Sequence, residues 1–362
     1  MPELTILSIN PGSTSTKIAL YQYKDKKHKR LFQENITHSN EALKDFNRII
    51  EQYAFRANII LDTLNAQGYS LDDLDCVVGR GGLLHAIPSG TYTVNEAMVR
   101  DIHKKDTLEH ASNLGCLLAK NIADKTGKPA FIVDPVVVDE FADIARFSGL
   151  PEFPRTSIFH ALNQKAMARK LAEDIGRGYE ELNLIVVHLG GGITVGAHKR
   201  GQVVDVNNGL TGEGPFTPER SGGLAAYDII SLCFQPGMTP EKAKKHLTGK
   251  GGMVAYLGTN DMREVEALID QGNKQAEELF YAMCYQISKE IGAMAAAVFA
   301  GKVDYILLTG GIAFDKRLVN YVADKTAYIA PVKVYPGEDE MMALYLGALR
   351  VMLKLEQAKT YE

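Results

Sequence analysis

Two short stretches of this sequence combine glycine, hydroxyl side chains and a cation in a pattern that suits an anion. The first, PGSTSTK at Pro11–Lys17, separates two apolar runs that are typical of β-strands. A plain hairpin needs only two turn residues, so seven residues rich in hydroxyls predict the lining of a site. The second, HLGGGIT at His188–Thr194, repeats the order of strand, glycine-rich turn and strand.

A third apolar run, YILLTGGIAF, breaks at Gly310 and Gly311. Glycines let backbone N–H groups approach phosphate oxygens because no Cβ stands in the way. Three such turns therefore predict a ligand that carries phosphate. The sequence has no G-x-x-x-x-G-K-[ST] pattern, which excludes a P-loop, and no strand–G-x-G-x-x-G–helix unit, which argues against a dinucleotide-binding Rossmann domain.

The elements that must position these turns alternate between strands and helices, which predicts an α/β fold. Apolar periodicity predicts helices over 40–66, 96–105, 112–126, 162–175 and 276–300. At 362 residues the chain has room for two domains of about 150 residues each. We interpret the two similar hairpins as an internal duplication, with one hairpin at the head of each domain. No linker of low complexity separates the halves, so we expect the domains to abut around a cleft.

Composition narrows the class of partner. The net charge of −4 provides no overall positive field for nucleic acid or an anionic membrane, so a bound anion must be held by local cations. Four widely spaced cysteines in apolar contexts indicate reduced, buried thiols, as in a cytoplasmic protein. We expect no signal peptide, and the most apolar helical run, Ile291–Gly301, is too short for a membrane span of about 20 residues.

Six motifs in order carry a resemblance to a known family: INPGSTSTKIALY, VVGRGGLLH, FHALNQKA, HLGGGITVGAH, FTPERSGGL and YPGEDEMMAL. They are similar to the butyrate kinases of the acetokinase family, in the superfamily of acetate and sugar kinases, heat-shock chaperones and actin. The two hairpins resemble its two phosphate segments, and LLTGGIAF resembles its adenosine segment. The resemblance implies two duplicated actin/ribonuclease-H-like domains around an ATP cleft, each with a mixed, five-stranded type of sheet and flanking helices. Their expected bounds are residues 1–153 with 341–362, and residues 154–340.

The resemblance also implies an activity, a cofactor and an assembly. The reaction is butyrate + ATP ⇌ butyryl phosphate + ADP, an in-line phosphoryl transfer with Mg²⁺ bound alongside ATP, in a homodimer or higher oligomer. Acetate kinases carry a second histidine where this chain has Gln164, and an asparagine where it has Gly191. These departures favour an acid longer than acetate. Isobutyrate, valerate, propionate and acetate stay open as alternatives.

The chemistry of this reaction calls for positive charge rather than a base. A carboxylic acid is already ionised at pH 7, so its attack on a γ-phosphoryl group needs cations that bring two anions together. In GRGG an arginine directly follows a buried strand, where a charge without an anionic partner would be costly. The residues that we expect to act in catalysis, on these grounds and on their match to the family, are Arg80, Arg220, His160 and Asp134.

The same matches extend to the nucleotide, the acid and the metal. The residues expected to bind nucleotide or phosphate are Asn10, Gly12, Ser13, Ser15, Lys17, His188, Gly190, Gly191, Gly192, Thr194, Gly310, Gly311 and Ile312. The pocket for the acid is expected at Leu83, Leu84, Pro88 and His110. Magnesium prefers hard oxygen ligands, and the candidates are Asn10, Glu338, Asp339 and Glu340. The sequence does not choose among the three acids, and an alternative is that they only complement the dipole of the following helix.

Two other functions stay open at this point. A sugar or polyol kinase of the same superfamily needs an aspartate base that faces a hydroxyl group, and Asp134 is the candidate for that role. A non-catalytic nucleotide switch resembling actin or a chaperone normally carries further subdomains, for which 362 residues leave no room.

Overall fold

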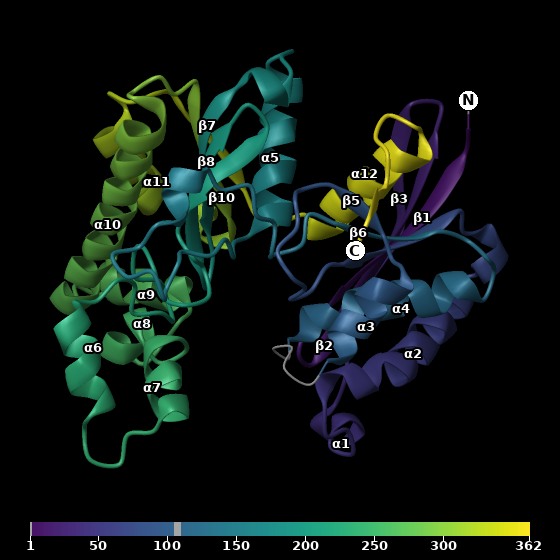
Figure 1. The fold of residues 1–362 in the computed structure, drawn as a ribbon, viewed down its shortest axis with the longest axis horizontal. Coiled ribbons are helices and arrows are strands. Elements are labelled where there is room, and N and C mark those ends of the chain that lie inside the picture. Colours follow the sequence, from purple (N-terminus) through teal and green to yellow (C-terminus); the bar gives the residue numbers. More distant parts are fainter. Residues whose placement is uncertain (1, 105–109) are drawn as a thin grey trace. The chain divides into compact units, whose positions relative to one another are not determined.

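A computed structural model describes residues 2–104 and 110–362 of the chain (Figure 1). Its contacts divide the chain into two compact units. Unit 1 consists of Met1–Val138 and Asp339–Glu362, and unit 2 consists of Asp139–Glu338. The chain therefore returns to unit 1 after it completes unit 2. The domain boundaries expected from the sequence, after residues 153 and 340, stay a prediction.

The described residues of unit 1 form a mixed sheet in the strand order β12-β5-β6-β4-β1-β2-β3. β1, β2 and β3 make an antiparallel meander, while β1, β4 and β6 run parallel. β5 and β12 extend the edge beyond β6. The strands are β1 (Leu4–Pro11), β2 (Ser15–Lys24), β3 (Lys27–Thr37), β4 (Cys76–Arg80), β5 (Thr91–Thr93), β6 (Ala130–Val133) and β12 (Lys359–Thr360).

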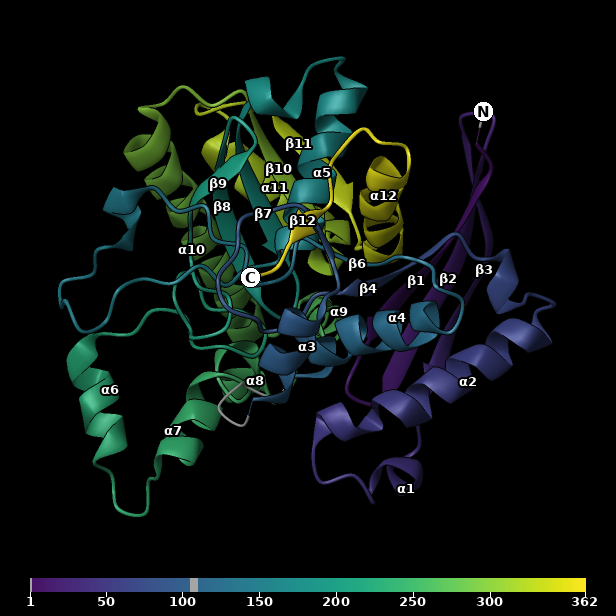
Figure 2. The same ribbon diagram turned by 45° about the vertical axis from the view of Figure 1, so that its right-hand side comes forward.

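Helices cover both faces of this sheet. α2 (Tyr53–Ala66) and α4 (Leu114–Asp124) pack side by side (Figure 2), and their apolar residues share one core with Leu7 and Ile9 of β1. On the other face lies α12 (Glu340–Met352), whose Gly347 contacts Val133 of β6. The remaining helical segments are α1 (Asn40–Leu43), α3 (Glu96–His103) and the 3₁₀ turns Ile49–Gln52, Leu71–Asp73 and Ala111–Asn113.

The described residues of unit 2 form a mixed sheet in the order β11-β10-β7-β8-β9. The long helix α10 (Lys274–Phe299) covers one face, and α5 (Ala161–Asp174) covers the other (Figure 1). The strands are β7 (Asn183–Leu189), β8 (Ile193–Lys199), β9 (Gln202–Val206), β10 (Tyr305–Gly310) and β11 (Val332–Pro336). The other helices are α6 (Ala226–Cys233), α7 (Pro240–Leu247), α8 (Gly252–Leu257), α9 (Met262–Asp270) and α11 (Lys316–Thr326), and the 3₁₀ turns are Asp143–Arg146, Tyr179–Glu181 and Gly311–Phe314.

The two sheets repeat one topology. The order β6-β4-β1-β2-β3 in unit 1 corresponds strand for strand, and direction for direction, to β11-β10-β7-β8-β9 in unit 2. Even the irregularity recurs, because the pairing of the second and third strands shifts register at Leu20/Tyr21 and again at Ala197/His198. The predicted duplication of mixed sheets with flanking helices is thereby confirmed.

One predicted helix is wrong in its first half. The sequence predicts a single helix over 40–66, but the structure has α1, then a 3₁₀ turn, then α2. The Glu51 carboxylate accepts hydrogen bonds from the backbone N–H groups of Asn47 and Arg48, which caps a new helical start. The other helices begin and end within a few residues of prediction, although Lys105 lies outside the described residues. Among the described residues, no helix has both the length and the apolar character that a membrane span requires.

Candidate active site

The first glycine-bearing turn, between β1 and β2, is held from the protein interior by Arg56 of α2. Its Nη1 donates to the carbonyl oxygens of Gly12 (2.7 Å) and Ser15 (2.9 Å), and its Nη2 donates to that of Ser13 (2.7 Å). The guanidinium is fully buried, and burial lowers the pKa of Arg56 to about 10. A positive charge whose recorded partners are neutral oxygens therefore lies directly beneath the turn.

A second cluster in unit 1 joins three residues that are far apart in the sequence. Glu340 Oε2, at the start of α12, accepts from Asn10 Nδ2 (2.5 Å) and from Arg80 Nη1 (2.9 Å). Arg80 Nη1 also lies 3.4 Å from Asn10 Oδ1. Arg80 Nε is buried and has no hydrogen-bond partner among the described residues. Because such a donor is costly to leave unsatisfied, Arg80 has capacity for a further, anionic partner.

The three successive acids before α12 serve different purposes. Glu338 contacts His188 of unit 2, with Oε1 3.2 Å from Nε2. Asp339 caps α12, because its Oδ1 accepts from the backbone N–H of Met342. Glu340 belongs to the cluster with Asn10 and Arg80. Of the three candidates, Glu340 is therefore the one that stands beside Asn10.

The second turn, between β7 and β8, is bound closely by the loop that carries Arg220. Thr217 Oγ1 donates to the carbonyl oxygen of Gly191 (2.7 Å) and accepts from the backbone N–H of Arg220 (3.0 Å). The Arg220 guanidinium lies against Gly192 so tightly that a Cβ there would stand 1.7 Å from Nη1. Burial lowers the pKa of Arg220, although Glu219 opposes this shift. A partly buried arginine is thus fixed at the turn.

Two histidines stack face to face beside this turn. The rings of His160 and His188 have centroids 3.7 Å apart and planes 9° apart. His188 Nδ1 lies 2.8 Å from Asn163 Oδ1, and His160 Nδ1 lies 3.0 Å from Thr194 Oγ1. A Cβ on Gly192 would stand 3.3 Å from His160 Cε1, so the imidazole edge and the Arg220 guanidinium converge on the same glycine. Two donors suited to phosphate oxygens meet at one point.

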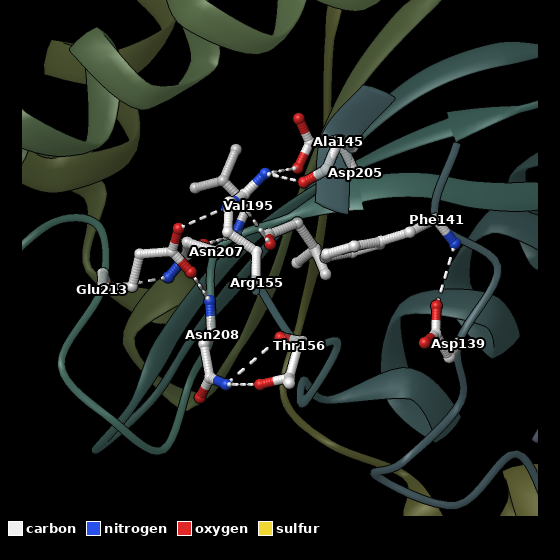
Figure 3. Close-up of polar contacts among 11 residues, drawn as sticks. Asp139, Phe141, Ala145, Arg155, Thr156, Val195, Asp205, Asn207, Asn208 and Glu213 are labelled. Carbon is white, nitrogen blue, oxygen red and sulfur yellow. Dashed lines mark hydrogen bonds and ion pairs between the residues drawn. The ribbon is translucent and has the colours of Figure 1, made fainter. Parts of the chain in front are cut away.

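The segment that leads to His160 is braced by Arg155 (Figure 3). Its guanidinium donates to Asp205, at the end of β9, and to Glu213, each at 2.9 Å. Asn208 Nδ2 donates to Thr156 Oγ1 (3.0 Å), and the backbone N–H of Asn208 donates to Glu213 (2.6 Å). The chain before His160 and the loop before Thr217 are therefore parts of one hydrogen-bonded assembly.

A cavity of about 990 Å³ opens beside the second turn within unit 2. Gly191 of the turn and Gly311 and Ile312 after β10 all line it, so the structure brings two of the three predicted glycine turns to one pocket. Asp261 and Arg263, at the start of α9, line the pocket as well. Its size suits a bound small molecule.

Comparison with known proteins decides the family. The model of the acetokinase family matches residues 155–328. The chain is 52% identical over 357 residues to butyrate kinase 2 of Clostridium acetobutylicum, covering 99% of each chain. It is 51% identical to a probable butyrate kinase of Clostridium botulinum, covering 98% of this chain and 99% of the relative. This chain belongs to the acetokinase family.

Solved structures agree with this acetokinase fold. The crystal structure of Porphyromonas gingivalis acetate kinase superposes with a TM-score of 0.77 at 20% identity, covering 98% of this chain and all of that one. A propionate kinase from Francisella tularensis gives a TM-score of 0.74 at 18% identity, covering 94% and 98% of the two chains. At these identities the likeness concerns the fold alone.

The acetokinase residues expected to hold the acid lie on two loops of unit 1. Leu83 and Leu84 follow Arg80 and pack partly against the unit 1 core, and Leu83 N–H donates to Asn113 Oδ1 (2.8 Å). Pro88 lies on the same loop, where its carbonyl accepts from Tyr92. His110 caps the turn Ala111–Asn113 through Ser112.

Asp134 plays a part in loop geometry. It follows β6 with a left-handed backbone, φ of 38°, and is almost fully buried. Its Oδ1 accepts from Gly90 N–H (2.7 Å), and its own N–H donates to the carbonyl oxygen of Gly90 (3.0 Å). The carboxylate thus fixes the loop that begins at Arg80 and ends at β5.

One expected phosphate ligand, Thr194, has protein partners on its hydroxyl. The Thr194 hydroxyl is buried between His160 and Gln164. Lys17 and Ser15 lie on β2, where Lys17 pairs across the sheet with Asn10. Sequence reasoning missed Arg56 as a support of the first turn, and its only signal was an arginine within the apolar run YAFRANII.

Proposed function

We propose that this acetokinase is a butyrate kinase that transfers the γ-phosphoryl group of ATP to the carboxylate of butyrate. The observation that carries the proposal is the convergence of Arg220 and His160 on Gly192 in the second phosphate turn. A partly buried cation and an imidazole at one glycine suit an equatorial phosphoryl oxygen. The names of the clostridial relatives supply the substrate class.

The carboxylate oxygen attacks phosphorus in line, and no proton has to be removed because the acid is ionised. The bond between the γ-phosphorus and the β,γ-bridging oxygen breaks, its electron pair stays on that oxygen and leaves with ADP, and the new bond from the carboxylate oxygen to phosphorus makes the acyl phosphate. Arg220 supplies positive charge to the transferring group, and His160 donates a hydrogen bond to it. Arg80, whose Nε has no hydrogen-bond partner among the described residues, is a further cation proposed for the reacting anions.

The nucleotide is assigned to the cavity of unit 2. In this assignment the second turn, whose Gly191 lines the cavity, takes the phosphates, and Gly311 with Ile312 lies beside the nucleoside. Arg263 and Asp261 at the start of α9 provide further polar groups to the lining. In this assignment the adenosine segment and the phosphate turn serve one ligand.

Mg²⁺ would supply charge neutralisation to the phosphates when bound. Asn10 and Glu340 provide an amide oxygen and a carboxylate, which fit an ion that keeps several waters and uses one or two carboxylates. Among the described residues no group of three His, Cys, Asp or Glu side chains is placed to hold a metal by itself. Asn10 and Glu340 are therefore expected to act together with ATP oxygens.

We assign the selectivity for the chain length of the acid to the loop after Arg80, at Leu83, Leu84 and Pro88. Each buried methylene stabilises binding by about 0.8 kcal/mol, so adjacent homologues differ only several-fold in kcat/KM. Butyrate is expected to be preferred, with isobutyrate, valerate and propionate as slower substrates and acetate the poorest.

We also propose a homodimer and a cytoplasmic location. α6 buries none of its residues, yet Tyr227, Ile230 and the following Phe234 are apolar and exposed. Such a face is unusual on a monomer, and a second copy of the chain is its proposed partner. Light scattering should give a dimer that Ile230→Ser with Phe234→Ser converts to monomer. The four cysteines are free thiols, as the reducing cytoplasm allows. Cys76, Cys116 and Cys284 are buried, but the predicted burial is wrong for Cys233, which is exposed at the end of α6.

A substrate panel tests the proposed function. Each acid is incubated with ATP, Mg²⁺ and hydroxylamine, which traps an acyl phosphate as its hydroxamate. Hydroxamate should form with butyrate and depend on ATP. Phosphorylation of a sugar or polyol without hydroxamate would instead favour the sugar kinase alternative, and nucleotide binding without any acceptor-dependent turnover would favour a nucleotide switch.

A further inference from the structure

A chain of hydrogen bonds inside unit 2 leads from Tyr179 to His160. Tyr179 OH lies 2.7 Å from His198 Nδ1, and His198 Nε2 lies 2.9 Å from Gln164 Oε1. Gln164 Nε2 lies 2.8 Å from Thr194 Oγ1, which lies 3.0 Å from His160 Nδ1. Tyr179, His198, Gln164 and Thr194 are all buried, so their polar hydrogens must be donated within the protein.

The direction of this chain is set at Gln164. Gln164 Nε2 also lies 3.1 Å from the backbone carbonyl oxygen of Thr194. A carbonyl can only accept, so the atom that faces it must be the amide nitrogen, and the amide oxygen must face His198. The amide group cannot reverse these roles without breaking the bond to the backbone.

The orientation of the Gln164 amide also fixes which ring nitrogen of His198 carries the proton. Its Nε2 must carry a proton to donate to the Gln164 oxygen, and its Nδ1 then accepts from Tyr179 OH. Full burial, with Lys165 and Arg169 nearby, lowers the pKa of His198 well below its usual value. The imidazole therefore stays neutral, with one donor and one acceptor.

Room for this arrangement comes from Gly196 in the middle of β8. A Cβ there would stand 2.4 Å from Gln164 Oε1 and 3.3 Å from His198 Nε2. A glycine inside a strand weakens the strand, so its presence at this place indicates that the close approach of Gln164 and His198 is used.

The Thr194 hydroxyl connects Gln164 to His160, so the order of donors and acceptors continues to the His160 ring. It accepts a hydrogen bond from Gln164 Nε2, and its other recorded partner is His160 Nδ1 at 3.0 Å. A buried hydroxyl has to donate its own proton, so we assign that proton to the bond with His160 Nδ1. We propose that Gln164 and Thr194 are positioning residues that hold His160 in the Nε2–H tautomer, as a neutral hydrogen-bond donor to the transferring phosphoryl group. This inference rests on the proposed kinase function for its purpose, but the tautomer itself does not depend on that function.

The tautomer can be measured without any turnover. Two-bond ¹H–¹⁵N correlation spectra of histidine-labelled enzyme distinguish the neutral ring forms, and the His160→Asn variant assigns the signals. The wild type should show His160 protonated at Nε2 and unprotonated at Nδ1. A His160 ring protonated at Nδ1 would overturn the proposal, whether or not the enzyme phosphorylates butyrate.

Variants then connect the tautomer to the reaction. Thr194→Val should give a mixture of His160 tautomers and lower kcat about tenfold, with KM for ATP changed less than threefold, and Thr194→Ser should restore both readouts. Gly196→Ala perturbs the same chain from the other side of Gln164 and should act like Thr194→Val. Thr326→Val, which removes another buried hydroxyl at the end of α11, is the matched control and should change neither readout. If Thr194→Val and Gly196→Ala leave the tautomer as in the wild type, Thr194 and Gln164 do not position His160. If the tautomer shifts as predicted but the enzyme shows no acid-dependent turnover, the positioning of His160 by Gln164 and Thr194 stands and the proposed function is refuted.

Discussion

Replacing Gly192 by alanine should separate catalysis from stability in this enzyme. The added Cβ would stand 1.7 Å from Arg220 Nη1, whereas unbonded heavy atoms rest about 3.5 Å apart. The guanidinium therefore has to move by about 1.8 Å. Since a displacement of about 1 Å at a reacting centre costs about 100-fold in rate, kcat should fall by at least that factor, or about 2.7 kcal/mol in activation free energy.

The stability of the Gly192→Ala variant should change little. The contacted atom is the far end of a flexible side chain, and Gly192 does not have the left-handed backbone that penalises alanine. We therefore expect the free energy of unfolding to fall by less than about 1 kcal/mol. The control is Gly292→Ala in α10, where the added Cβ meets no atom within 4 Å, which should leave kcat unchanged and add about 0.5–1 kcal/mol of stability.

Both quantities are accessible in one set of preparations. Hydroxamate formation from butyrate and ATP gives kcat, calorimetric titration gives nucleotide affinity, and urea unfolding gives stability. A Gly192→Ala enzyme that turns over within threefold of the wild type would refute the placement of Arg220 at the phosphoryl group. A loss of rate that is matched by a loss of folded protein would refute the argument from geometry.

Three further predictions follow from other parts of the molecule. Arg220→Ala should lower kcat by about 1,000-fold while the calorimetric Kd for ATP rises only a few-fold; equal losses in both would indicate a binding role. Arg56→Met removes a buried guanidinium and leaves the carbonyl oxygens of the first turn unpaired, so urea unfolding should show a loss of about 3 kcal/mol, and an unchanged midpoint would contradict the support of that turn by Arg56. Burial, with Arg56 close by, lowers the pKa of His38 to about 4. In the unfolded chain this histidine binds its proton near pH 6.5, so acid favours the unfolded state. The free energy of unfolding should therefore keep its full value above pH 6.5 and fall by about 3 kcal/mol as the pH drops to 4. His38→Gln should lose less over that range, and a parallel pH dependence would contradict the assignment.

The duplicated hairpins could be predicted from the sequence because their signal is local. Strand, glycine-bearing turn and strand follow one another within about 20 residues, and the structure repeats them with the same register shift in both units. The helix predicted over 40–66 failed for an equally local reason, since Glu51 caps a new start in mid-pattern. A periodic pattern does not reveal that a carboxylate has been used as a cap.

The contacts within the site depend on distant pairings that no periodicity carries. The run Glu338-Asp339-Glu340 is uniform in sequence, yet its three side chains reach His188, the backbone of α12 and Arg80 respectively. The Thr194 hydroxyl, expected to bind phosphate, lies beside His160 and accepts a hydrogen bond from Gln164, thirty residues earlier in the sequence. Tertiary packing decides where a side chain at the end of a strand points, so this direction could not be predicted from the local sequence pattern.

The central claim is that a butyrate oxygen attacks the γ-phosphorus of ATP. The most direct measurement uses butyrate labelled with ¹⁸O in both carboxylate positions and follows the product by ³¹P NMR. The account predicts butyryl phosphate whose bridging oxygen carries the label, seen as an isotope shift on its phosphorus signal. An acyl phosphate without ¹⁸O at the bridge, or ADP released with no butyrate-dependent phosphorus product, would contradict it.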